Sequence, residues 1–500
     1  MPVRVLLIHT RPSAGDCTVP YSVLTVAAPL VERGHHVTIL DEYATPGFVN
    51  ECLRIARDAD VVGISCFTGI QIDSAVRVAQ ALRTQRPELL IIWGGYHPSL
   101  YPEVTARSPL VDGVITGQGE WAFLGLVEAI ARGEDPLETP GLVRLREGKV
   151  VHNPHGPKFT NMEDFPAYPF DLVPLRSFLI DSLSPKSISY HSSIGCPFRC
   201  NFCTVTQIYE RRWSGLSSNR VVADMKRLIQ ATGATSVELY DNNFFVSDER
   251  TRAIAQGLID QRVGTIWSGE ARPDKIASYD RETMQLLVRS GLRWVFIGAE
   301  SGHDEVLSMM ERDHTASDIV SAAEQLARHN IDVTFSFNLG YPGEPADNFE
   351  VTERLCRELI RINPRTELMV YITTAYESTP AFHRVEGEAK QSVATRTLET
   401  WIHLDQRSGD DKPWLSPDYA RRLWNFQMET FFATSFLHRV RLKRRHPYNP
   451  FLRALTRAAN LHFQLGYHDS ILDLRALNRL FKVSSRIDPR RTIDSWTGRS

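Results

Sequence analysis

The sequence lacks a long apolar run. Its 500 residues contain no stretch of about eighteen apolar residues, so we expect no transmembrane helix. The apolar run in the opening segment MPVRVLLIH is too short for the hydrophobic part of a signal peptide. No charge of one sign dominates either, because 57 lysines and arginines nearly balance 59 aspartates and glutamates. No global field therefore favours a nucleic acid or a membrane as a partner.

Cysteine is scarce, and its distribution argues against a disulfide framework. Four of the seven cysteines are scattered along the chain as Cys17, Cys52, Cys66 and Cys356. Isolated free thiols persist in a reducing compartment, so we expect a cytoplasmic protein.

The three remaining cysteines lie together in the segment HSSIGCPFRCNFCTV. Cys196, Cys200 and Cys203 form a C-x3-C-x2-C pattern, which fits neither one strand nor one face of a helix. The pattern indicates a loop around a compact inorganic centre, and thiolates select an iron–sulfur cluster or zinc. A structural zinc site usually has four protein ligands, and the one nearby candidate, His191, precedes the loop on a predicted strand. A [4Fe-4S] cluster on three thiolates would keep one iron open. The alternatives are a zinc knuckle or three unrelated cysteines of the core.

Apolar runs alternate with helical patterns over the N-terminal third of the chain. The runs lie at residues 4–9, 36–40, 61–65, 89–93 and 113–116. Such strands with crossover helices indicate a parallel sheet covered on both faces, with ligands beyond the carboxyl ends of its strands. These ends are rich in glycine and small polar residues, which let the backbone approach a large ligand closely. Neither G-x-G-x-x-G nor a Walker loop is present, which disfavours a dinucleotide or a triphosphate.

Six further strand patterns alternate with helices between Ser187 and about residue 374. This repeat predicts a partial barrel, and parallel barrels have their chemistry at the carboxyl ends of the strands. Polar side chains gather at those predicted ends: Asp241, Asn243, Glu270, Arg272, Glu300 and Asn338.

The cysteine loop, with the aromatic Phe202 before its last cysteine, resembles the cluster loop of radical S-adenosylmethionine (SAM) enzymes. The resemblance covers about residues 186 to 380. It implies that the three thiolates hold a [4Fe-4S] cluster and that SAM chelates the open iron through its amine and carboxylate. It also implies that the reduced cluster cleaves SAM to a 5′-deoxyadenosyl radical, which removes hydrogen from an unactivated carbon.

The same resemblance implies side-chain contacts to SAM. It places Phe202 near the adenine, Glu300 at the ribose, and the turn after the second strand at the amine. Carboxylates and amides suit the amine and the ribose diol, and a guanidinium suits the carboxylate. The predicted SAM contacts are therefore Phe202, Asp241, Asn243, Glu270, Arg272, Glu300 and Asn338.

The N-terminal sheet carries a second resemblance. With GGYHPS after one strand and GQGE after the next, it is similar to the cobalamin-binding domain fused to many radical SAM enzymes. The D-x-H-x-x-G signature, whose histidine coordinates cobalt from below in other cobalamin proteins, is absent, so the resemblance implies cobalamin without a histidine ligand. A degenerate sheet that is retained only for packing is the alternative. The predicted cobalamin contacts are Thr10, Ser65, Phe67, Thr68, Gly69, Gly94, Gly95, His97, Pro98, Gly117, Gly119 and Glu120.

The chain is therefore predicted to be an α/β protein with four parts. A Rossmann-like cobalamin-binding parallel sheet spans residues 1–150, and a proline-rich linker spans 151–185. A partial (β/α)6 radical SAM barrel follows at 186–390, and a mainly helical region completes the chain at 391–500.

The last of these parts contains a dense basic run at residues 437–446, LHRVRLKRRH. It suggests an amphipathic surface for an anionic or lipid-like substrate, or, more plainly, a solvated basic helix end. The segment Ser416-Pro-Asp-Tyr predicts the start of a helix ahead of it.

Together, the two implied cofactors predict a methyltransferase. One SAM would methylate cobalamin, a second would give the radical that abstracts a substrate hydrogen, and the substrate radical would take the methyl group from methylcobalamin. The expected substrate is a small molecule, either a secondary metabolite or a lipid-like compound. The expected reductant is a flavodoxin or a ferredoxin, since both cofactors need external electrons.

Three alternatives remain. The same architecture could perform an oxidative ring closure or a ring rearrangement without methyl transfer. A methylthiotransferase would have a second cluster-binding cysteine trio upstream, and Cys17, Cys52 and Cys66 are too dispersed for that. A non-catalytic cobalamin or metal sensor is the alternative from another class, and the array of candidate SAM contacts argues against it.

Overall fold

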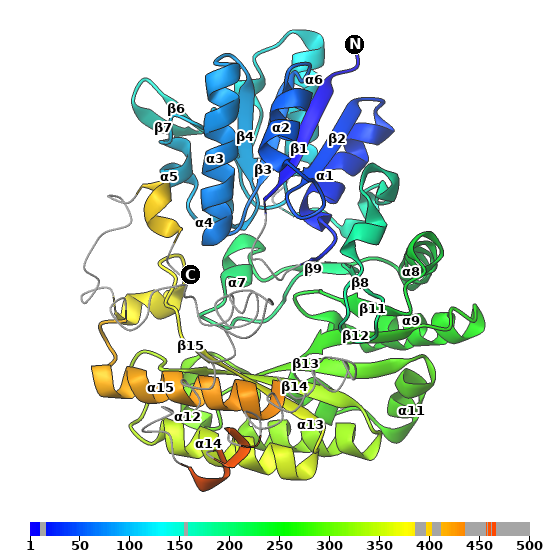
Figure 1. Cartoon of the computed structure of the whole chain (residues 1–500), viewed down its shortest axis with the longest axis vertical. Helices are drawn as coiled ribbons and strands as arrows, with labels where there is room; N and C mark the ends of the chain where they lie inside the picture. Colours follow the sequence, from blue (N-terminus) through cyan, green and yellow to red (C-terminus); the bar gives the residue numbers. More distant parts are fainter. Residues whose placement is uncertain are drawn as a thin grey trace.

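The computed structural model describes residues 1–10, 17–154, 159–385, 397–402, 412–435, 457, 459–461 and 463–466. Two α/β bodies lie one above the other in the view of Figure 1, with the N-terminal body in blue and cyan and the second body in green and yellow. The basic run predicted at 437–446 lies outside the described residues. Among those described, no helix has the length and apolar character needed to cross a bilayer.

The N-terminal sheet has seven strands in the order β2-β1-β3-β4-β5-β6-β7. The first five of these pair in parallel, and their order is a common doubly wound arrangement. An antiparallel hairpin, β6-β7, extends the sheet and was not predicted from the sequence. The strands are β1 (Arg4–His9), β2 (His36–Asp41), β3 (Val61–Ser65), β4 (Leu90–Gly94), β5 (Gly113–Ile115), β6 (Leu142–Arg146) and β7 (Lys149–His152).

Alternate residues of the central strands enter two separate cores, because successive side chains on a strand point to opposite faces. Val5 and Leu7 of β1 pack with helices α1 and α6, whereas Leu6 and Ile8 pack with α2 and α3. This double burial explains the nearly continuous apolar runs in the sequence. The helices are α1 (Tyr21–Glu32), α2 (Phe48–Ala56), α3 (Ile70–Gln85), α4 (Tyr96–Leu100), α5 (Pro102–Ala106) and α6 (Glu120–Arg132).

The segment between the two sheets packs into a shared core. It forms three short 3-10 helices, at Met162–Asp164, Phe170–Leu172 and Leu175–Phe178, and buries several aromatic side chains. The Tyr21 ring of α1 meets the Tyr168 ring edge to face, with centroids 5.1 Å apart. One continuous apolar cluster therefore joins the N-terminal sheet to the second body.

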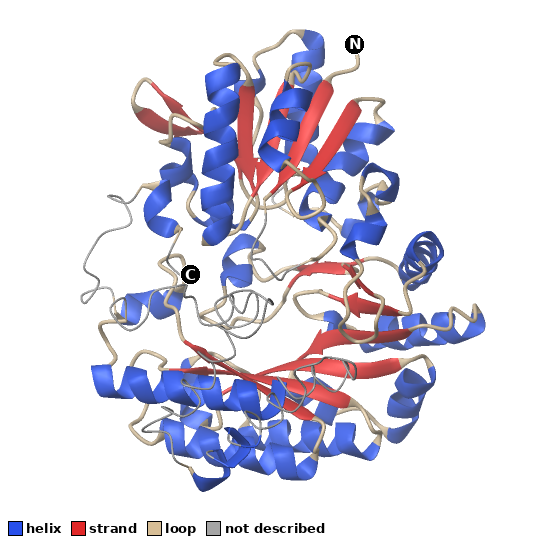
Figure 2. Ribbon diagram, in the orientation of Figure 1, coloured by secondary structure: helices blue, strands red, loops and turns tan. Residues whose placement is uncertain are grey.

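The second sheet has six strands, all paired in parallel, in the order β15-β14-β13-β12-β11-β8. Its helices lie on the outer face of the open sheet, as Figure 2 shows, which confirms the predicted α/β class. The strands are β8 (Ser187–Tyr190), β11 (Ser236–Leu239), β12 (Ile266–Ala271), β13 (Leu292–Glu300), β14 (Asp332–Leu339) and β15 (Thr366–Ile372). The helices are α8 (Ser218–Thr232), α9 (Asp248–Asp260), α10 (Pro273–Ala277), α11 (Arg281–Arg289), α12 (Asp304–Met309), α13 (Ala316–Arg328) and α14 (Asn348–Ile362).

The strand predicted to run from Ser187 into the cysteine loop is interrupted. β8 ends at Tyr190, and a separate short strand, β9 (Ser193–Gly195), pairs antiparallel with β10 (Trp213–Gly215). The prediction of one continuous strand is wrong here, because the backbone N–H of Ser192 turns away to donate to the Asp241 carboxylate at 2.6 Å.

The described C-terminal residues cover one edge of the barrel. Helix α15 (Pro417–Thr430) packs along β15, and the Ser416 hydroxyl accepts from the Tyr419 backbone N–H at 3.3 Å. The predicted helix start is therefore confirmed as an N-cap. A short 3-10 helix at Leu398–Trp401 packs instead against the N-terminal body, where Trp401 is fully buried.

Candidate functional site

The three cysteines of the C-x3-C-x2-C pattern lie on the loop between β9 and the short helix α7 (Thr204–Ile208). Cys200 is buried, and Cys196 and Cys203 are half-buried. The turn into the loop is made by Gly195, whose φ of 73° is left-handed and whose position leaves no room for a Cβ beside the Arg212 carbonyl.

The thiols lie close enough to influence one another. Burial raises the pKa of the Cys203 thiol to about 12, with a further contribution from the neighbouring Cys200. Among the described residues, no three His, Cys, Asp or Glu side chains already converge as metal ligands. The donor set itself is what fits a cluster, since three soft sulfur ligands on one loop would be relieved of the cost of burial by binding iron.

Asp241, at the end of β11, holds the chain that leads into the cysteine loop. Its carboxylate accepts from the backbone N–H and the hydroxyl of Ser192, each at 2.6 Å, and from the Ser193 hydroxyl at 2.7 Å. Its neighbour Asn242 accepts from the Gly195 backbone N–H at 3.2 Å. Asp241 was predicted to contact the SAM amine, and in the structure these hydrogen bonds give it a role in positioning the loop.

Glu300 ends β13 with a φ of 65°, at a register shift against β14 that turns its side chain to the strand ends. Its carboxylate accepts from the Asn338 amide at 2.7 Å and lies 3.8 Å from the Arg312 guanidinium. Burial raises the pKa of Glu300, and Arg312 and Asn338 oppose that shift. The structure thus brings together two predicted SAM contacts, Glu300 and Asn338, around one carboxylate.

Arg272 presents unused donors beside the cysteine loop. Its side chain is buried, and its Nε donates to the Asp274 carboxylate at 3.0 Å. Both terminal nitrogens lack a partner among the described residues, and the guanidinium lies 3.9 Å from the centre of the Phe198 ring. Buried donors without partners are costly, so these two nitrogens are suited to bind the carboxylate of a ligand as a two-pronged fork.

Two further polar groups face the same region. The buried Asn243 side chain lies beside Cys196, and its amide oxygen has no partner among the described residues. Glu270 is half-buried at the end of β12, and burial, with the charge of Asp241, raises its pKa to about 8. Phe202 is half-buried and packs against a small apolar cluster of Val306, Met310, Tyr341 and Ala381.

The end of the N-terminal sheet where its parallel strands finish, called here its carboxyl edge, is built mainly from backbone and small side chains. Gly95 has a φ of 94°, and a Cβ there would lie 2.8 Å from the Cys66 carbonyl oxygen. The Ser65 hydroxyl, at the end of β3, donates to the Ser22 hydroxyl at 3.0 Å, and the buried Thr10 hydroxyl donates to the Ser65 carbonyl at 3.3 Å. A Cβ at the neighbouring Gly94 would make only an ordinary van der Waals contact.

A stacked aromatic pair lies on this edge, in which Phe67 is exposed and Tyr96 is half-buried. The rings of Phe67 and Tyr96 stack with centroids 4.3 Å apart, and Phe67 is 43% exposed. Beside them, Gly69 opens helix α3 with a φ of 102°. The exposed Phe67 ring, supported by Tyr96, offers a flat apolar contact to a large ligand.

His97 and Pro98, by contrast, are buried. The His97 ring packs against Tyr101 and Trp401, with Nδ1 3.2 Å from the Thr68 hydroxyl, and burial lowers its pKa to about 3. These surroundings give His97 a packing role behind the turn.

The G-x-G-E turn lies next to the same edge. Gly117 is left-handed, with a φ of 66°, and its N–H donates to the Ser99 hydroxyl at 2.9 Å. Gly119 precedes α6, and Glu120 starts that helix with a buried carboxylate, one oxygen of which has no partner among the described residues. Burial raises the pKa of Glu120.

The two edges face each other across the centre of the molecule. Near the middle of Figure 1, α4 of the N-terminal body lies beside α7, which follows the cysteine loop. The Asn242 amide donates to the Tyr96 hydroxyl at 3.2 Å, and the same Asn242 accepts from Gly195. One side chain therefore links the GGYHPS turn to the cysteine loop.

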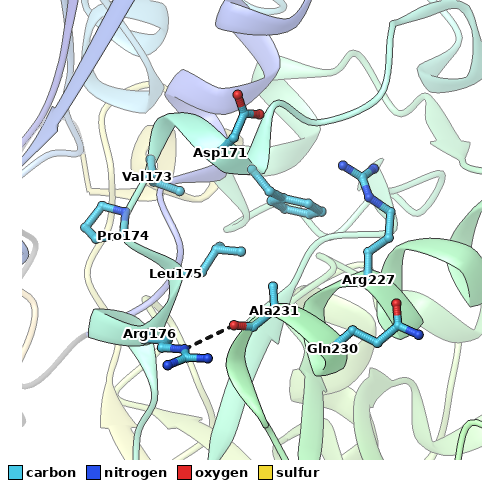
Figure 3. A pocket seen from close by; sticks show the side chains of 9 residues that line it. Asp171, Val173, Pro174, Leu175, Arg176, Arg227, Gln230 and Ala231 are labelled. Atoms are coloured by element: carbon cyan, nitrogen blue, oxygen red, sulfur yellow. Dashed lines mark hydrogen bonds between the residues drawn. The ribbon is translucent and has the colours of Figure 1, made fainter.

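A surface cavity of about 770 Å³ lies elsewhere, between the linker and α8 (Figure 3). Phe170, Val173 and Leu175 form its apolar wall, and Arg176 and Arg227 extend at its sides, with Arg176 donating to the Ala231 carbonyl at 3.2 Å. None of its lining residues is a predicted cofactor contact.

Sequence reasoning missed three residues of this centre: Tyr96, Asn242 and Arg312. Tyr96 and Asn242 are adjacent to predicted contacts, and an inspection of neighbours in the two turns could have found them. Arg312 lies beyond α12 and outside any strand end, and no motif or periodicity marks it.

Comparison with known proteins agrees with this layout. The model of the radical SAM superfamily matches residues 190–356, and that of the B12 binding domain matches residues 11–127. An uncharacterised methyltransferase of Pyrococcus horikoshii is 27% identical over 339 residues, covering 67% of this chain and 72% of the relative. An anaerobic magnesium-protoporphyrin IX monomethyl ester cyclase of Rubrivivax gelatinosus is 23% identical over 369 residues, covering 71% of this chain and 66% of the relative.

A solved structure shares the whole fold. The radical SAM methyltransferase TsrM of Kitasatospora setae, with cobalamin and a [4Fe-4S] cluster bound, superposes with a TM-score of 0.68 at 16% identity. The match covers 97% of this chain and 99% of that protein.

Proposed function

The chain belongs to the radical SAM superfamily and has a B12-binding domain ahead of its radical SAM domain, and from this premise we propose that it is a cobalamin-dependent radical SAM methyltransferase. It would place a methyl group on an unactivated carbon of a small molecule. When bound, the cluster with SAM supplies a hydrogen-abstracting radical, and cobalamin supplies a transferable methyl group. The named methyltransferases among the relatives support this reading of the two domains.

The observation that carries the proposal is the meeting of the two carboxyl edges. Tyr96 of the N-terminal turn, Asn242 after β11 and Gly195 before the cysteine loop form one chain of hydrogen bonds. Radical chemistry with methyl transfer needs both cofactors to reach one substrate carbon, so their sites must share a space. A protein that used only one of the cofactors would not need this contact.

The barrel residues have separate tasks in orienting SAM. The two free nitrogens of Arg272 would bind the SAM carboxylate as a fork, and Glu300, held by Asn338, would accept from the ribose hydroxyls. Asn243 and Glu270 would face the cationic end of the ligand, where a carboxylate with a raised pKa gains most from a positive neighbour. Phe202 would cover the adenine.

The N-terminal edge would bind cobalamin through shape. The turns at Gly69, Gly95 and Gly117 let backbone groups approach a large ring, and the Phe67–Tyr96 pair would lie against it. The same pair would exclude water from the space between the two edges.

The remaining parts of the proposal concern partners and organisation. We propose cobalamin binding within residues 1–150, a linker at 151–185, SAM chemistry within 186–390, and a C-terminal region at 391–500 that shapes the substrate space. A flavodoxin or a ferredoxin in the cytoplasm would supply electrons, and the substrate would be a secondary metabolite or a lipid-like molecule.

The direct test uses SAM labelled with ¹³C in its methyl group. The anaerobically reconstituted protein, with cobalamin and a chemical reductant, is incubated with a small-molecule extract of its native host, and new products are identified by mass spectrometry. The proposal predicts 5′-deoxyadenosine together with a product that gains the labelled carbon. Formation of 5′-deoxyadenosine with no labelled product other than those of SAM itself would count against methyl transfer.

One relative favours a second candidate. The cyclase of Rubrivivax gelatinosus is named for a ring closure, so an oxidative cyclisation on the same architecture is the alternative. It predicts a product that has lost hydrogens and contains no label. The same extract experiment therefore separates the two reactions.

A further inference from the structure

Arg312 connects the cysteine loop to the end of β13. Its Nη1 donates to the Cys200 sulfur at 3.1 Å, and its Nη2 donates to the Gly298 carbonyl at 2.6 Å. The same Nη2 lies 3.8 Å from the Glu300 carboxylate. The guanidinium thus lies next to both Cys200, a predicted cluster ligand, and the Glu300 carboxylate, which is predicted to bind the ribose of SAM.

The contact is sheltered from solvent. Only 9% of the Arg312 side chain and 8% of the Glu300 side chain are exposed, and Cys200 is 5% exposed. In such surroundings a charge acts more strongly than at the surface, because little water screens it. The packing is also tight, since a Cβ at Gly298 would lie 2.7 Å from a Glu300 oxygen.

We propose that Arg312 is a positioning residue that stabilises the reduced cluster through the N–H···S hydrogen bond to Cys200, and so raises its reduction potential. Reduction adds one electron to the cluster and its thiolates, and a positive hydrogen-bond donor at one sulfur favours the more negative state. Hydrogen bonds to cluster sulfurs and nearby charge are established levers of reduction potential in iron–sulfur proteins. The inference rests on the cluster assignment alone and not on methyl transfer, so either can fail without the other.

The chain offers a matched control on the same loop. Arg199 lies one residue before Cys200, and its guanidinium lies 3.2 Å from Asp313, the residue after Arg312. Its side chain is 59% exposed, and among the described residues it bonds to Asp313 and not to a sulfur atom. Arg199→Met therefore removes one positive charge from the same loop without removing the hydrogen bond to Cys200.

The test measures the midpoint potential of the cluster in the reconstituted full-length protein without SAM, by a redox titration followed by electron paramagnetic resonance. Arg312→Met and Arg312→Gln are both neutral, and Arg312→Gln still offers an amide NH2 group as a donor. We expect a more negative midpoint for both, with the larger shift for Arg312→Met, and a midpoint close to that of the unmodified protein for Arg199→Met. Iron and sulfide content and the thermal unfolding midpoint are measured for each variant.

Two results would overturn the inference. One is an unchanged midpoint in a neutral Arg312 variant that holds a full complement of iron and sulfide. The other is failure of both neutral variants to hold a cluster while Arg199→Met holds one, which would make Arg312 a structural requirement for the loop. If only one neutral variant assembles, its midpoint decides.

Discussion

The two carboxyl edges that meet at the centre of this molecule are made of different chemical groups. The N-terminal edge consists of glycine turns with positive φ angles, serine and threonine hydroxyls, and a stacked aromatic pair in which Phe67 is exposed. The barrel edge consists of buried charged side chains, such as Asp241, Arg272 and Glu300. A backbone surface suits a large ring that is recognised by shape, whereas buried charges suit a small zwitterion that is recognised by its groups.

The two edges should also respond differently to amino-acid substitution. A side chain added at Gly95 collides with backbone, so damage there is steric and independent of charge. A charge removed from the barrel edge leaves other groups without partners, so damage there depends on ligand and pH. The four predictions below use this contrast, in order of decreasing effect.

The largest effect is expected for Cys200→Ala. Loss of one of three sulfur ligands should abolish the cluster and, with it, the formation of 5′-deoxyadenosine from SAM. Iron content and the brown charge-transfer absorbance after reconstitution measure the loss of the cluster. Chromatography of the SAM reaction measures the loss of 5′-deoxyadenosine formation. Cys17→Ala, which alters a half-buried thiol outside the loop, should retain both. Full SAM cleavage by Cys200→Ala would contradict the assignment of Cys200 as a cluster ligand.

Gly95→Ala should be the most damaging change on the N-terminal edge. The φ of 94° is essentially restricted to glycine, and the new Cβ would lie 2.8 Å from the Cys66 oxygen. We expect a loss of about 2–4 kcal/mol in the free energy of unfolding and weaker corrinoid binding, measured by denaturant titration and equilibrium dialysis. Gly34→Ala, with a φ of 81° and no atom within 4 Å, isolates the cost of backbone strain and should bind the corrinoid normally. Equal effects of both changes would contradict a close approach at Gly95.

Arg272→Met should weaken SAM binding with little effect on the corrinoid. The substitution removes two buried donors that are free to bind a carboxylate, and we expect about a 10- to 100-fold rise in the SAM dissociation constant. Arg272→Lys should give an intermediate value, since it retains charge but not the fork. Calorimetric titration of the reconstituted protein measures both. An unchanged dissociation constant in Arg272→Met would show that the fork serves another group.

Glu270→Gln should produce the smallest effect, visible as a change in pH dependence. The carboxyl has a pKa of about 8 in the folded protein against 4.5 in the unfolded chain. Between these values only the folded state keeps the proton, so stability falls as the pH rises through the window. The Gln variant lacks this decline, so at the upper end of the window it should be more stable than the unmodified protein.

Denaturant titrations of the SAM-free protein at both ends of the window measure the difference. Asp280→Asn offers a control, because the hydrogen bond from the Thr283 hydroxyl lowers the pKa of Asp280, so this carboxyl is ionised in both states throughout the window and its replacement should leave the slope there unchanged. Parallel pH profiles for Glu270→Gln and the unmodified protein would rule out a neutral carboxyl at this position.

Much of the fold could be predicted because its signals are local. Runs such as Val61–Ser65 are buried on both faces, so their apolar character is continuous and visible in the sequence. The hairpin β6-β7 escaped prediction because it is short, lies at a sheet edge and alternates with charged residues. The strand into the cysteine loop was misjudged because a distant carboxylate, that of Asp241, interrupts it.

The sequence by itself determined the cluster loop and the two resemblances, because thiolate spacing and glycine turns are properties of a few neighbouring residues. The contacts of individual SAM and cobalamin residues stay predictions. Only the tertiary structure decided that Asp241 holds the loop, that His97 is packed behind its turn, and that Asn242 reaches Tyr96 across 146 positions. It also brought Arg312 to Cys200, 112 positions away. Such pairs are set by how two sheets close on each other, which no local pattern encodes.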